Sequence, residues 1–78
     1  DFIIPRARDE VDAIECKWDP QQFEPASLKA FRERYAKGAN YLVSATVDAA
    51  YWKQTSGLRI FVCNPDGWLE QAKVENMR

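Results

Sequence analysis

The stretch VDAIECKW, residues 11–18, decides the fold expected for this chain. Apolar and polar residues alternate along it, and this period of two predicts a strand with one face toward a core. The two faces that result are Val11, Ala13, Glu15 and Lys17, and Asp12, Ile14, Cys16 and Trp18. A strand that only closes a sheet has no need of Glu15 and Lys17 together on one face. Their presence raises the question of a functional site.

Both sides of this strand carry clear signals. Residues 1–5, DFIIP, predict a strand that ends at its proline, and the charged residues 6–10 predict the connection of a hairpin. After a loop over residues 19–25, apolar residues at spacings of three and four predict a helix over residues 25–38, with Gly38 as its end. Residues 40–46 then predict a strand. A strand, a helix and a strand in this order indicate a right-handed parallel crossover.

The remaining residues are less clear. Residues 47–57 fit either a short helix or a loop, and residues 58–64 predict a further strand. Residues 64–67, NPDG, fit a turn or the start of a short helix capped by Asn64, and we favour the helix. We expect a frayed tail over residues 72–78. The fold class is therefore α/β: a small mixed sheet of about four strands with one main helix and a short C-terminal helix.

Composition limits the function. The 78 residues allow one domain with a small core, and a chain that opens with Asp1 before an apolar run leads us to expect a fragment of a longer protein. The 11 basic and 12 acidic residues sum to a net charge of −1, which is not the basic excess typical of nucleic-acid binding. Without histidine, a His-assisted nucleophile is excluded within the chain, and zinc is not expected. Cys16 and Cys63 lie in apolar runs and are expected as buried, reduced thiols in a cytoplasmic protein. No membrane span is expected.

Glu15 and Lys17 are the candidate functional groups of this strand. They are same-face neighbours about 7 Å apart along a strand, which suits a carboxylate on a metal with an ammonium beside the reacting group. Asp12 has the wrong parity to join them. Asp1 is the better second acid, since pairing of residues 1–5 with 11–18 places it near Glu15, and two carboxylates suit Mg²⁺. On the pattern alone, a Glu-x-Lys pair more often marks a solvated sheet face than a catalytic one.

Aromatic residues beside basic ones are a second feature of the sequence. Residues 51–53, Tyr-Trp-Lys, form the best candidate for stacking on nucleic-acid bases. Aromatic residues in a chain of this size more often belong to a core or its edge. We therefore favour the structural role for all three tryptophans: Trp18, Trp52 and Trp68.

The order of these motifs resembles a known superfamily. DFIIP, a short connection, IECK and then the helix and strand of residues 23–44 resemble the PD-(D/E)xK nuclease-like superfamily. More narrowly, DF and AIECKW are similar to the C-terminal nuclease-like domain of prokaryotic AAA-type ATPases. The resemblance covers residues 1–68. It implies a restriction-endonuclease-like core that lacks its first helix.

The resemblance implies a function and a site. Asp1 and Glu15 would bind Mg²⁺, or Mn²⁺ in its place, together with the backbone carbonyl of Cys16. Lys17 would orient water or stabilise the transition state of metal-dependent hydrolysis of a DNA phosphodiester. The N-terminal ATPase portion of a parent chain would be a partner. The alternative is a non-catalytic interaction or scaffold domain, and in either case we expect the isolated chain to form a homodimer or exchange elements, because one sheet edge is left open.

Overall fold

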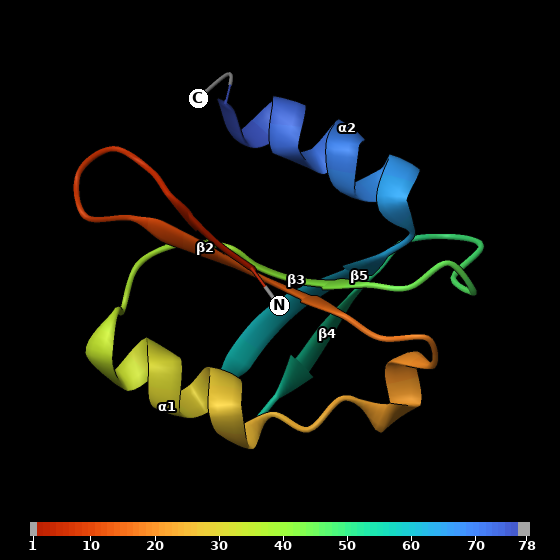
Figure 1. The fold of residues 1–78 in the computed structure, drawn as a ribbon, viewed down its shortest axis with the longest axis horizontal. Coiled ribbons are helices and arrows are strands. Elements are labelled where there is room, and N and C mark those ends of the chain that lie inside the picture. The colour runs from red at the N-terminus through yellow and green to blue at the C-terminus, as the bar shows by residue number, and fades with distance from the viewer. Residues whose placement is uncertain (1, 77–78) are drawn as a thin grey trace.

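Five strands form one mixed sheet in the order β1-β2-β3-β5-β4, in a computed structural model that describes residues 2–76. The strands are β1 (Phe2–Pro5), β2 (Val11–Cys16), β3 (Asn40–Val43), β4 (Tyr51–Thr55) and β5 (Leu58–Cys63). The helical elements are the 3-10 turn η1 (Pro20–Gln22), helix α1 (Ala26–Arg34) and helix α2 (Pro65–Asn76). Helix α2 covers one face of the sheet, and α1 with η1 lies on the other (Figure 1). None of the helices described is long and apolar enough to cross a membrane.

The sequence predictions around β2 are confirmed. Strands β1 and β2 pair antiparallel with Phe2 opposite Ile14, which is the expected hairpin. Strand β3 returns beside β2 in parallel after α1, which is the expected crossover. The three central strands β2, β3 and β5 are parallel, and each edge strand is antiparallel to its neighbour.

The expected count of four strands is wrong, because residues 51–55 form the edge strand β4. It pairs antiparallel with β5 through a two-residue turn, Ser56-Gly57, in which both residues have positive φ (52° and 76°). Positive φ at both central residues is the geometry that matches the twist of a two-residue hairpin. The Ser-Gly dipeptide was the local signal for this turn. The sequence did not predict this strand, because YWKQT is largely polar and lies exposed at the edge of the sheet.

Helix boundaries also differ from the prediction. Helix α1 ends at Arg34, not at residue 38, and Gly38 lies beyond it with a φ of 136°. Helix α2 continues to Asn76, so the expected frayed tail is wrong for residues 72–76, while 77–78 lie outside the described residues. The favoured helix at NPDG is confirmed: the Asn64 side chain accepts a hydrogen bond of 2.8 Å from the Gly67 amide, as an N-cap does.

The main apolar cluster lies between the sheet and α1. Its buried members are Phe23, Leu42, Val47, Leu58, Ile60 and Val62. Leu28 of α1 packs against this cluster, although no residue of α1 is itself buried. On the opposite face, the ring of Trp68 from α2 meets the ring of Tyr41 edge-on at 6.4 Å. Each helix therefore covers its face of the sheet through few large side chains.

The two cysteines lie in different environments. Cys63 is fully buried, as expected, whereas Cys16 is exposed, and the prediction of burial is wrong for it. Cys16 is the last residue of β2, where the strand leaves the sheet. Both are thiols, and no disulfide joins them.

Two buried groups make the free energy of unfolding depend on pH in the alkaline range. Burial raises the pKa of Tyr41 to about 12, with a smaller contribution from the negative charge of Asp12, and burial raises the pKa of Cys63 to about 11. Their ordinary values are 10.0 and 9.0. The folded chain thus holds both protons more tightly than the unfolded chain. The stability they contribute is complete below pH 9 and is lost as pH rises through 9 to 12.

We expect the free energy of unfolding in urea to be level up to about pH 9 and then to fall by up to about 3 kcal/mol per group. Tyr41→Phe should remove the step between pH 10 and 12. It should cost little near pH 7, because the Tyr41 hydroxyl is buried without a hydrogen-bond partner among the described residues. Tyr51→Phe, at a half-exposed ring, is the control. An unchanged alkaline step in Tyr41→Phe would contradict this assignment.

Candidate active site at the end of strand β2

Strand pairing determines which way Glu15 and Lys17 point. Glu15 lies opposite Leu42 of β3, so its side chain is on the face that α1 covers. It lines a hollow of about 200 Å³ between the β1–β2 hairpin and α1, to which Leu28 and Phe31 contribute apolar walls. Lys17 follows the end of β2, and its amide still donates a hydrogen bond of 3.0 Å to the Val43 carbonyl. The two charges therefore lie at the carboxyl end of a strand in the parallel part of the sheet, where open α/β sheets bind ligands.

Glu15 and Lys17 are in direct contact. The Lys17 Nζ lies 3.6 Å from the Glu15 Oε2, with the two side chains 36% and 23% exposed respectively. The spacing along the strand predicted separated groups more than an ion pair, and the side chains close that gap by leaning toward each other. Both remain accessible to a ligand from solvent.

The described residues supply only part of a metal site. Within residues 2–76, no group of three or more His, Cys, Asp and Glu side chains could hold a metal ion. Asp1, the second acid expected from the sequence, lies outside the described residues. Glu15 alone fits one ligand position, and Mg²⁺ does bind through one or two carboxylates while it keeps several waters. The backbone carbonyl of Cys16 is adjacent in the chain, while its side chain is on the opposite face.

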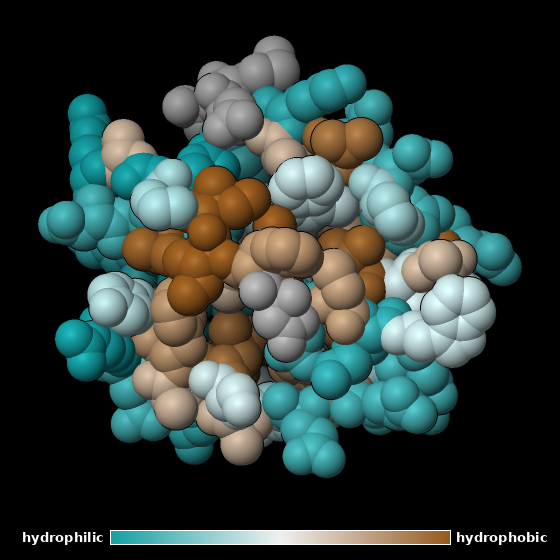
Figure 2. Space-filling model, in the orientation of Figure 1, coloured by the Kyte–Doolittle hydropathy of each residue, from teal (hydrophilic) through white to brown (hydrophobic). Residues whose placement is uncertain are grey.

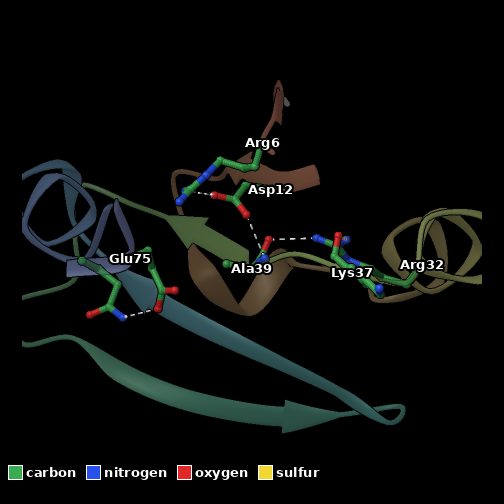
Figure 3. Close-up of polar contacts among 7 residues, drawn as sticks. Arg6, Asp12, Arg32, Lys37, Ala39 and Glu75 are labelled. Carbon is green, nitrogen blue, oxygen red and sulfur yellow. Dashed lines mark hydrogen bonds and ion pairs between the residues drawn. The ribbon is translucent and has the colours of Figure 1, made fainter. Parts of the chain in front are cut away.

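Asp12 lies on the other face of β2, as its parity predicts. Its carboxylate accepts hydrogen bonds of 2.9 Å from the Arg6 guanidinium and from the Ala39 amide, and the residue is buried (Figure 3). These contacts join the hairpin to the segment before β3. Each oxygen of the Asp12 carboxylate therefore accepts a hydrogen bond within the fold. Asp12 has a structural role and is separate from Glu15.

Arg32 is a key residue that the sequence analysis did not single out. From the last turn of α1, its guanidinium donates to the Asn40 side chain at 2.7 Å. It also donates to the carbonyls of Tyr35, Lys37 and Ala39 at 3.1, 3.0 and 2.8 Å. Figure 3 shows the contact between Arg32 and Ala39. Burial lowers the pKa of Arg32, and the nearby Asp12 charge partly opposes this. The available signal was a basic residue in the last turn of a helix, which commonly bonds the free carbonyls there.

Comparison with family models, with curated proteins and with solved structures found no match to this chain. The fold and its site define a mixed α/β domain with an accessible acid–base pair at the end of β2.

Proposed function

We propose that this chain is a nuclease-like domain that hydrolyses DNA phosphodiester bonds with Mg²⁺ and works beside an ATPase portion of a longer protein. The observation that supports it is the convergence of Glu15 and Lys17, 3.6 Å apart and accessible, at the end of β2. The hairpin, helix and parallel strand around them follow the order that the PD-(D/E)xK resemblance implies.

In this proposal Glu15 would hold Mg²⁺ together with Asp1 and the backbone carbonyl of Cys16. A metal held there would supply an activated water and would neutralise phosphate charge. Because a cation close to Glu15 opposes a divalent ion, Lys17 turns its ammonium away from the carboxylate and toward the phosphate. There it stabilises the negative charge that develops in the transition state.

Titration with Mg²⁺ and Mn²⁺, followed by amide NMR shifts, tests the metal site. We expect saturable shifts confined to residues near position 1 and to residues 15–17. Glu15→Ala should abolish them with little loss of stability, because the side chain is partly exposed and its ion pair with Lys17 is accessible to solvent. Asp48→Ala, which removes an exposed acid elsewhere, should leave them unchanged.

Cleavage of a supercoiled plasmid with Mg²⁺ tests catalysis. Glu15→Ala should stop it, and Lys17→Met should lower the rate about 100-fold or more while metal shifts persist. Asp48→Ala is again the control. Wild-type protein that shows neither metal shifts nor cleavage would contradict the proposal.

A second candidate function, a non-catalytic interaction domain, is favoured by the exposure of β1. Phe2, Ile3 and Ile4 on this edge strand are 62%, 57% and 36% exposed. Figure 2 shows hydrophobic side chains gathered on the face viewed, over the region of β1. Unpaired edges invite another strand, and the opposite edge, β4, carries Lys53, a common protection against such pairing. The occupant that we propose for β1 is a second copy of this chain, paired strand to strand.

Sedimentation velocity over a range of concentrations tests this pairing. We expect a monomer–dimer equilibrium for the wild type and a monomer for Ile3→Lys, because a charge on the edge opposes strand addition. Leu69→Lys, at a half-exposed apolar residue of α2, should still dimerise. A clean monomer at high concentration would refute the pairing, and so would an unchanged equilibrium in Ile3→Lys.

A further inference from the structure

The three tryptophans differ in how much of each ring is open. The Arg59 guanidinium lies 3.8 Å from the centre of the Trp52 ring, and Phe61 lies 4.8 Å from it. Trp68 packs edge-on with Tyr41. Trp18 is 78% exposed, the highest value among the exposed large hydrophobic residues, and no ring or guanidinium packs on it within residues 2–76. Trp18 is therefore a better candidate for stacking on a base than residues 51–53.

The backbone that carries Trp18 is held firmly. Its carbonyl accepts hydrogen bonds from the hydroxyls of Ser44, at 2.7 Å, and Thr46, at 3.2 Å. Ser44 is 2% exposed, so this attachment point is part of the buried structure after β3. On the other side, Asp19 caps η1 by accepting a hydrogen bond of 2.9 Å from the Gln21 amide. An exposed ring on such a support loses little backbone freedom when a flat ligand stacks on it.

Lys17 of the candidate site comes directly before Trp18 in the chain. Both residues follow Cys16, the last residue of β2, so the alternation of faces expected along the strand does not determine the relative direction of their side chains. An aromatic ring next to a cation is the combination that binds single-stranded nucleic acid, with the ring on a base and the cation on a phosphate. Stacking depends little on net charge, which matters for a chain whose net charge is −1. A base inside a duplex has no free face for such a ring.

We propose that Trp18 stacks on an unpaired base of single-stranded DNA while Lys17 contacts a neighbouring phosphate. This inference rests on the proposed function and names its substrate class: single-stranded or locally unpaired DNA, in preference to intact duplex. Trp18 is a binding and specificity residue and takes no part in bond cleavage.

Fluorescence anisotropy of a labelled 20-nucleotide oligothymidine, and of a duplex of the same length, tests this in EDTA, where cleavage cannot occur. We expect tighter binding of the single strand. Trp18→Ala should weaken single-strand binding about 10-fold or more. Trp18→Phe should retain most of it, because a phenyl ring still stacks. Tyr51→Ala removes a half-exposed aromatic ring from the 51–53 stretch on β4 and is the control. It should bind the single strand like the wild type.

Unchanged single-strand binding in Trp18→Ala would overturn the inference, as would equal or tighter binding of the duplex, or no binding of either DNA. Circular dichroism of Trp18→Ala should match the wild type, since the lost ring is mostly in solvent. The proposed function fails in a different way: Mg²⁺-dependent cleavage is then absent, while Trp18-dependent binding in EDTA remains and supports the stacking site on its own.

Discussion

Replacing Gly38 by alanine is expected to lower the free energy of unfolding by about 4 kcal/mol or more. For a domain of this size, such a loss leaves most of the molecules unfolded. Gly38 has a φ of 136°, a backbone conformation that residues with a side chain rarely adopt. A Cβ atom there would overlap the carbonyl oxygen of Val11 and lie 2.6 Å from its carbonyl carbon. These are backbone atoms of β2 and cannot turn aside.

The close approach at Gly38 is part of the sheet. The amides of Val11 and Ala13 donate hydrogen bonds of 2.9 Å to the carbonyls of Lys37 and Ala39, on either side of the glycine. To relieve the overlap, the segment must move off β2, and both bonds are then lost. Urea denaturation followed by tryptophan fluorescence measures the loss.

Gly57→Ala is the matched control. Gly57 also has a positive φ, 76°, but nothing lies within 4 Å of the position of a Cβ atom. The substitution therefore carries only the conformational cost, about 1 to 2 kcal/mol. A Gly38→Ala protein that is no less stable than Gly57→Ala would show that the approach to β2 is looser than the structure indicates.

The second large effect is expected for Arg32→Ala, which should cost about 2 to 4 kcal/mol. The substitution removes four hydrogen bonds that hold the end of α1 to the connection before β3. It leaves the side-chain oxygen of Asn40, a buried residue, without its donor. Arg32→Lys should recover only part of the loss, because an ammonium cannot match the fork of a guanidinium.

Arg34→Ala, two residues along the same helix, is the control. Arg34 is exposed, and its guanidinium lies 5.6 Å from the ring centre of Tyr35, so its loss should cost less than about 1 kcal/mol. Thermal and urea unfolding of the variants measure the differences. Equal stability of Arg32→Ala and Arg34→Ala would contradict the role given to Arg32.

The site could be predicted in part. The period of two along β2 places Glu15 and Lys17 on one face and Asp12 on the other, because side-chain direction in a strand follows from position alone. Their contact at 3.6 Å could not be predicted, since it depends on side-chain torsions. The exposure of Trp18 also could not, because the sequence does not say which neighbours come to cover a ring.

What the sequence by itself determined are the local elements: the β1–β2 hairpin, the crossover through α1 and the Asn64 cap of α2. Each depends on residues near one another in the chain, so periodicity and capping residues are enough to indicate it. The tertiary structure alone decided the edge position of β4, the early end of α1 and the need for glycine at position 38. These depend on contacts between distant segments, such as Gly38 against Val11, and no local pattern of residues records such an approach.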